Sequence, residues 1–172
     1  AYKVRPASDL PPGKFETGTL SHESIAGTLG VVEYFEWLSE TINPHSKKTN
    51  NRRQRILSAM KAIQQYENQL CEQLLDGLKS LSMVRVHGIT EPQGMERRVP
   101  TVSFSVKGMH PDQLAQSLAD KNIFVWSGHN YAVEAVRTLG LLEQGGLLRV
   151  GPVHYNRETE IDLFLAELEQ IL

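Results

Sequence analysis

Three short segments contain more polar side chains than packing alone requires, and the first of them could bind an anion. Residues 15–21 place Gly18 and several hydroxyls, including that of Thr19, directly before a stretch of helical apolar spacing. The free backbone N–H groups and the positive dipole end of a helix meet at such a point, and a threonine hydroxyl adds a donor. An ordinary helix N-cap is the alternative, and the sequence by itself favours it.

The other two segments belong to the second half of the chain. His129 lies in the polar stretch 127–131 after a predicted strand, where a rigid sheet can position a functional loop. Arg149 lies inside the apolar strand 147–150, and its guanidinium fork suits a carboxylate held by two hydrogen bonds. The alternatives are a structural hydrogen bond for His129 and a solvent-facing position for Arg149.

Composition excludes several classes of protein. The 172 residues carry 18 Lys and Arg against 20 Asp and Glu, a net charge of -2, which argues against a nucleic-acid partner. No apolar run approaches the roughly 20 residues of a membrane span, so we expect no membrane association. The single cysteine, Cys71, rules out a disulfide framework and is expected in the core. No metal-ligand spacing occurs, and a reducing, cytoplasmic location is predicted.

The first half of the chain is predicted to be mostly helical. Residues 1–20 form an extended lead-in that includes the anion-contacting segment, because prolines exclude a long helix there. Two long helices fill residues 21–81: one is capped by Thr19 or Ser21 and ends at Asn43-Pro44, and the other spans about 52–81. A basic cluster around the junction is interpreted as a solvated face: Lys47, Lys48, Arg52, Arg53 and Arg55.

Residues 82–172 are predicted to form a small α+β domain. Alternating apolar residues indicate strands near 84–89, 102–106, 123–126 and 147–150. Pro111 at a first helical position starts a short helix, and Asn156 is predicted to cap the last one. Strands and helices in this order favour an α+β layer.

The three polar segments, in their order, resemble one known family. Residues 14–19, Lys-Phe-Glu-Thr-Gly-Thr, are similar to its R-F-E-x-G-T segment. Residues 123–129, Ile-Phe-Val-Trp-Ser-Gly-His, are similar to its I-x-V-R-x-G-H stretch, and residues 148–162 to its R-x-S…Y-N-x-x-x-E-I-D ending. The chain thus resembles the C-terminal portion of the cysteine desulfurase-like group of class V aminotransferases, which are pyridoxal-phosphate enzymes of fold type I.

This resemblance implies a fold and a set of roles. The fold is the small C-terminal domain of such an enzyme, a four-stranded, mainly antiparallel sheet with helices on one face, preceded by two long helices that link to a large domain. Thr19 would donate to the phosphate of pyridoxal 5'-phosphate, in this family typically that of the neighbouring subunit, which implies a homodimer. Arg149 would bind the α-carboxylate of a small amino-acid substrate, with His129 nearby.

Two departures from the family pattern limit what the resemblance implies. The Schiff-base lysine and the Asp that pairs with the pyridinium nitrogen lie upstream of the R-F-E-x-G-T segment in the family, and neither position is present here. We therefore expect this chain alone to be an inactive C-terminal fragment. Desulfurases also carry a cysteine two residues after the G-H pair, where this chain has Tyr131, and Trp126 stands where many relatives have Arg. Transfer, lyase or other pyridoxal-phosphate reactions on an amino acid stay open.

The rival interpretation is a non-catalytic α+β module that keeps the fold and binds a partner. A self-standing anion-binding domain is a third interpretation. An upstream lysine and Asp in the complete protein would discriminate the enzyme from both. If the chain is a fragment, the long helix at about 52–81 and the segment before it should expose apolar faces that normally meet the large domain.

Overall fold

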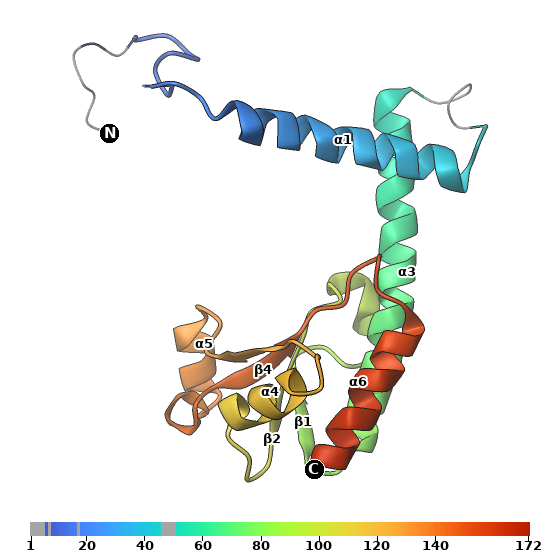
Figure 1. Ribbon diagram of the computed structural model, residues 1–172, viewed down its shortest axis with the longest axis vertical. Coiled ribbons are helices and arrows are strands. Elements are labelled where there is room, and N and C mark those ends of the chain that lie inside the picture. The colour runs from blue at the N-terminus through green and yellow to red at the C-terminus, as the bar shows by residue number, and fades with distance from the viewer. Residues whose placement is uncertain (1–5, 7, 17, 46–50) are drawn as a thin grey trace. The chain divides into compact units, whose positions relative to one another are not determined.

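A computed structural model describes residues 6, 8–16, 18–45 and 51–172 of the chain (Figure 1). These residues form two compact units, 1–61 and 62–172. The boundary falls inside one long helix, α3 (Arg52–Ser80), whose first turns belong to the first unit.

The first unit contains helix α1 (His22–Ile42) and the start of α3. The Ser21 hydroxyl accepts a hydrogen bond from the Ser24 N–H at 3.2 Å, and Asn43 leaves the helical conformation, so both predicted ends of this helix are confirmed. The Glu36 carboxylate binds Arg55 and, at 2.9 Å, Arg52. Arg52 and Arg55, two members of the predicted basic cluster, therefore join α3 to α1. Lys47 and Lys48 of that cluster lie outside the described residues.

Part of the predicted lead-in differs from the expectation. Residues 11–15 form consecutive turns in which the Lys14 N–H donates to the Leu10 carbonyl and the Phe15 N–H to the Pro12 carbonyl. This segment is therefore folded back and not extended. Proline fixes φ near the value of a turn position, so the residues that exclude a helix here favour a turn as readily as an extended chain.

Several apolar side chains of α1 are exposed. Ile25 and Leu29 are more than half exposed, at 55% and 51%, and Trp37 is exposed at 57%. Within this helix only Ser39 is buried.

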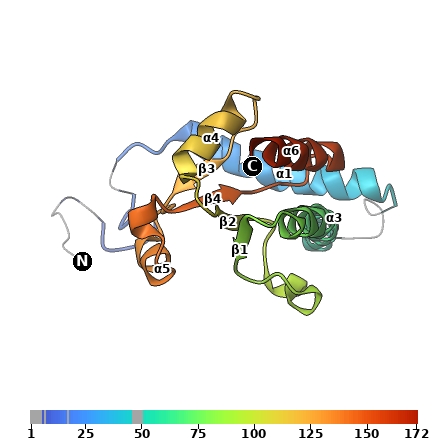
Figure 2. The ribbon, with the colours of Figure 1, turned by 90° about the horizontal axis from the view of Figure 1, so that it is seen from below.

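The second unit is built on a four-stranded antiparallel sheet. Its strands are β1 (Val84–His87), β2 (Val102–Val106), β3 (Trp126–Gly128) and β4 (Leu147–Val150), in the order β1-β2-β4-β3. The end of α3 together with α4 (Pro111–Ala119) and α6 (Glu158–Ile171) covers one side of this sheet (Figures 1 and 2). The predicted α+β class, with an antiparallel sheet and helices on one face, is confirmed. Three short elements complete the unit: η1 (Pro92–Arg97), α5 (Val133–Thr138) and η2 (Leu142–Gln144).

The core lies between that sheet face and the three helices. Leu70, Leu74 and Leu78 recur every fourth residue on α3 and are fully buried. Phe104 of β2 pairs with Leu148 of β4 and meets the Phe164 ring edge-on at 6.4 Å. Burial of these side chains fixes which face of each strand turns inward, and therefore which residues line the other face.

Two predicted boundaries are wrong by a few residues. The third strand is Trp126–Gly128 and not 123–126, because the Ile123 N–H donates to the Leu118 carbonyl at the end of α4 and Ile123 packs against the core from a connecting segment. The last helix is capped at Arg157, whose N–H donates to the Glu160 carboxylate at 2.7 Å. Asn156 instead accepts a hydrogen bond from the Val153 N–H and closes the preceding turn.

None of the helices in the described part of the chain combines the length and apolarity that crossing a membrane would require.

Candidate functional site

The side of the sheet away from the helices carries a set of polar side chains, here called the open sheet face. Val102, Phe104 and Val106 point into the core, so Ser103 and Ser105 point to the opposite side. The strand register assigns the remaining members to the same side: Arg85, His87, Trp126 and Arg149.

One row of this face crosses all four strands. His87 pairs with Ser103, Ser103 with Arg149, and Arg149 with Trp126. Neighbouring strands lie about 4.8 Å apart, so the four side chains stand side by side. The fold thus brings Arg149 together with residues from three other strands.

Arg149 is half-buried on this face and has an aromatic neighbour in place of an acidic one. Its guanidinium carbon lies over the Trp126 ring, 5.4 Å from the ring centroid. Of the carboxylates in the described residues, none forms an ion pair with Arg149. Its hydrogen-bonding edges are therefore available for a carboxylate ligand, which is the chemistry predicted for it.

His87 and Ser105 form a second polar pair on the open sheet face, which was not predicted from the sequence. The His87 Nε2 lies 2.8 Å from the Ser105 hydroxyl. Burial lowers the pKa of His87 below 6.5, and the neighbouring Arg85 charge lowers it further. The alternation of apolar and polar residues in the strands was the available signal, since Arg85, His87, Ser103 and Ser105 occupy every second position.

The lowered pKa of His87 predicts a pH dependence of stability. Well above the unfolded pKa of 6.5, the His87 imidazole is neutral in both states and does not change the free energy of unfolding. As the pH falls from 6.5 toward the lower pKa of the folded state, the unfolded state binds the proton more readily, so the free energy of unfolding decreases. We expect the free energy of unfolding of the parent chain to fall relative to that of His87→Gln across this window. Urea unfolding of both proteins from pH 7.5 to 5 measures the difference, and parallel curves would contradict the prediction.

His129 directly follows β3, and its imidazole contacts the loop in which it lies. It is exposed, its Nδ1 accepts a hydrogen bond from the Tyr131 N–H at 3.1 Å, and the two rings meet edge-on. Trp126 pairs with Arg149, and His129 follows Trp126 by three residues, or about 10 Å of extended chain. The direct strand partner of Arg149 is therefore Trp126 and not His129.

Thr19 belongs to the first unit, where it is exposed and its hydroxyl bonds to no described residue. The N-terminus of α1 is capped by Ser21, and Glu23 also lies in its first turn. A hydrogen bond to its own backbone N–H, and a second from Ser21, lower the pKa of Glu23. Ser21 and Glu23 thus already accept hydrogen bonds from backbone N–H groups at this helix end. Thr19 offers a neutral hydroxyl donor.

Thr19 and Arg149, each within its own unit, have hydrogen-bond donors of the kind that the resemblance calls for. Pyridoxal phosphate presents a phosphate, for which the Thr19 hydroxyl is a suitable donor, and an amino-acid substrate presents a carboxylate, for which Arg149 is suitable. Thr19 and Arg149 lie in different units.

Cys71 is fully buried among the leucines of α3, as predicted from its neighbours. Burial raises the pKa of the Cys71 thiol above 9.0, and Glu72 acts in the same direction, whereas Arg98 opposes them. A buried, protonated thiol is a poor nucleophile.

This position predicts that Cys71 is protected from alkylation. We expect iodoacetamide at pH 8 to modify the folded chain at least about 100 times more slowly than the chain in urea, because reaction requires opening of the core. Mass spectrometry over a time course measures both rates. Rapid modification of the folded chain would contradict the burial of this thiol.

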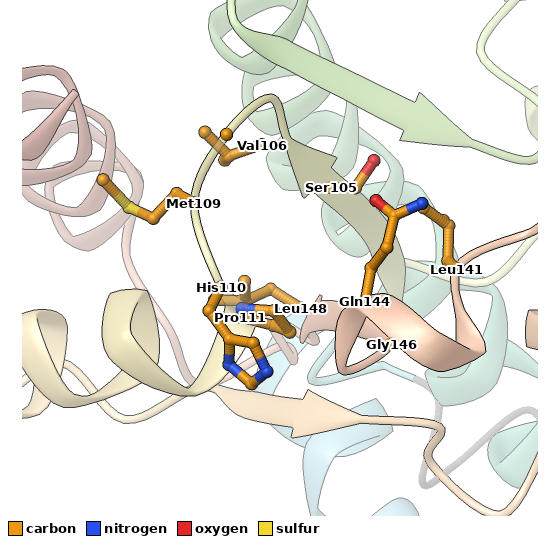
Figure 3. A pocket seen from close by; sticks show the side chains of 10 residues that line it. Ser105, Val106, Met109, His110, Pro111, Leu141, Gln144, Gly146 and Leu148 are labelled. Atoms are coloured by element: carbon orange, nitrogen blue, oxygen red, sulfur yellow. The ribbon is translucent and has the colours of Figure 1, made fainter.

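The pocket shown in Figure 3 shares one residue, Ser105, with the open sheet face. It encloses about 200 Å³ between β2, the start of α4 and the segment around η2. His110, Gln144 and apolar side chains such as Met109 line it, and Arg149, His129 and Thr19 do not. The His110 Nδ1 accepts a hydrogen bond from the Asp112 N–H, so this imidazole caps α4.

Comparison with known protein families gives a match that covers most of the chain. The family model described as Aminotransferase class-V matches residues 7–164. The chain belongs to this family. The resemblance read from the residues is therefore confirmed at the level of the family.

Curated relatives of this class-V aminotransferase chain are considerably longer. It is 29% identical over 160 residues to the uncharacterized protein MT3887 of Mycobacterium tuberculosis, covering 93% of this chain and 37% of that protein. It is also 29% identical to a probable cysteine desulfurase of Methanothermobacter thermautotrophicus, covering 93% of this chain and 34% of that protein. The chain thus spans about a third of the length of these relatives.

A solved structure matches the fold of this chain. The apo structure of a cysteine desulfurase from Thermococcus onnurineus NA1 matches with a TM-score of 0.59 and 29% identity. The match covers 70% of this chain and 28% of that one.

Proposed function

We propose that the protein containing this chain is a pyridoxal-phosphate enzyme that acts on a small amino acid, with Arg149 binding the substrate carboxylate. One observation carries the proposal: a half-buried arginine on the open sheet face has no acidic partner among the described residues. A partly buried guanidinium without an anionic partner is typical of a residue that binds an anionic ligand.

Each candidate residue has a limited role in this proposal. Arg149 binds and orients the carboxylate, which fixes the bonds around the neighbouring carbon relative to the cofactor. Thr19 donates its hydroxyl to the cofactor phosphate. His129 contributes to the substrate side of the site through the loop after β3. Pyridoxal phosphate supplies the electron sink for the reaction when bound.

The proposal extends to the rest of the enzyme. The resemblance assigns the cofactor-binding lysine and its partner Asp to sequence upstream of residue 14, so we propose that catalysis requires residues beyond those of this chain and that residues 1–172 alone are inactive. A homodimer that shares the cofactor site follows from the role given to Thr19. The free thiol of Cys71 is compatible with a reducing, cytoplasmic compartment.

The reaction class is set partly by the loop after β3. Tyr131 is 90% exposed there, in the position where the desulfurases that this chain resembles carry a cysteine. A phenol near neutral pH does not accept sulfur as a thiolate does. We therefore favour transfer or lyase chemistry over formation of a persulfide at this loop.

The test uses the complete protein loaded with pyridoxal phosphate and treated with L-cysteine. Absorbance of the cofactor is followed while alanine and sulfide are assayed in the same tube. A spectral change without either product supports chemistry on another amino acid. Alanine and sulfide together would support desulfuration with an acceptor other than residue 131. Failure to bind the cofactor would overturn the proposal and favour a partner-binding module.

A further inference from the structure

Trp126 occupies a position that the hydrophobic core does not explain. Its side chain is 56% exposed, and it takes no part in the buried cluster between the sheet and the helices. Tryptophan is among the most costly residues to leave in water, so a large exposed ring beside a functional residue calls for a role.

The role suggested by the geometry concerns Arg149. Trp126 is its direct partner across the β3–β4 pair, and the guanidinium carbon lies 5.4 Å from the ring centroid. A cation over the face of tryptophan within about 6 Å is attracted by the ring, and tryptophan attracts cations more strongly than tyrosine or phenylalanine.

This contact leaves the functional edges of Arg149 free. A guanidinium has five N–H donors and a carboxylate uses two of them, so a ring contact leaves donors for a carboxylate. On the other strand, the direct partner of Arg149 is Ser103, whose small side chain leaves space beside the guanidinium. The row therefore has a bulky aromatic side chain on one side of Arg149 and a small polar one on the other.

We propose that Trp126 is a positioning residue, which holds the Arg149 guanidinium in the orientation that binds the substrate carboxylate. An arginine side chain otherwise samples many rotamers, and fixing it before the ligand arrives reduces the entropy lost on binding. This inference rests on the proposed role of Arg149 as the carboxylate-binding residue.

The experiment isolates the contribution of the carboxylate to binding. The complete protein is loaded with pyridoxal phosphate and titrated with L-alanine and, separately, with L-alaninamide, which lacks the negative charge. Cofactor absorbance at equilibrium gives both dissociation constants, and their ratio measures how strongly the protein prefers the carboxylate.

Two matched variants separate a cation–π role from simple packing. Trp126→Phe keeps an aromatic face and is expected to change the preference for L-alanine by no more than about twofold. Trp126→Leu keeps an apolar side chain without the ring and is expected to reduce that preference about fivefold. Steady-state kinetics on an accepted amino acid should show a higher KM for Trp126→Leu with little change in kcat.

The outcomes distinguish this inference from the proposed function. An unchanged preference in Trp126→Leu, or an equal loss of affinity for both ligands, would overturn the positioning role while Arg149 kept its own. If Arg149→Met leaves the preference for L-alanine intact, the proposed role of Arg149 fails, and that of Trp126 fails with it. Thermal unfolding of each variant checks that the sheet is intact.

Discussion

Replacing Arg149 with methionine is expected to weaken binding of a substrate carboxylate by at least about 100-fold, the scale of losing a charged, doubly hydrogen-bonded partner. Methionine retains much of the side-chain length and removes the charge and all the donors. Because Arg149 lacks an acidic partner among the described residues, no buried carboxylate is left behind, and the fold should survive. The dissociation constant for L-alanine, measured with the cofactor-loaded complete protein, reports the loss.

Two further variants define what the loss means. Arg149→Lys keeps the charge without the fork and should recover only part of the affinity. Arg137→Met removes an exposed arginine of α5 whose partner is Glu134, and it should bind L-alanine like the parent protein. Comparable losses in the Arg137 and Arg149 variants would indicate a general electrostatic effect and count against a specific site.

Substitution of Gly146 by alanine is expected to lower the free energy of unfolding by about 3 kcal/mol, combining strained backbone with a steric clash. Gly146 has φ of +96°, where side chains are disfavoured, and an added Cβ would lie 2.4 Å from the carbonyl carbon and oxygen of Gly128. This contact joins the start of β4 to the end of β3, so relief of the clash must move the strand that carries Trp126. Urea unfolding measures the change.

Gly108 supplies the matched control for this substitution. It also has positive φ, at +78°, but an added Cβ meets nothing within 4 Å. Gly108→Ala should therefore show the backbone effect alone, about 1 kcal/mol. Equal losses in the two variants would show that the approach of Gly146 to Gly128 does not limit stability.

The sequence predicted those features that depend on local chemistry. Ser21 and Asn43 bound α1 because capping and helix termination act within a few residues. Leu70, Leu74 and Leu78 repeat with the period of a helix and could be assigned to a core before any neighbour was known. Arg149 was recognised because a charge in an apolar strand is conspicuous, and the ordered motifs identified the family correctly.

The sequence-based predictions were wrong where the same local residues are compatible with two backbone conformations. Ile123 and Val125 are as suitable for a buried connection as for a strand, and the pairing of β3 with β4 decided between them. Asn156 is a good helix cap by type, yet its side chain closes the turn before α6. Proline in residues 11–15 excluded a helix but did not distinguish a turn from an extended chain.

The grouping of His87, Ser103, Trp126 and Arg149 in one row was decided by the tertiary structure alone. These residues come from four strands, and the strand register, set by burial of the opposite face, brings them side by side. The sequence by itself determined which side chains could bind a carboxylate or a phosphate, because that depends on their chemistry. Their neighbours depend on the pairing of distant strands, whose register is fixed by the packing of the core.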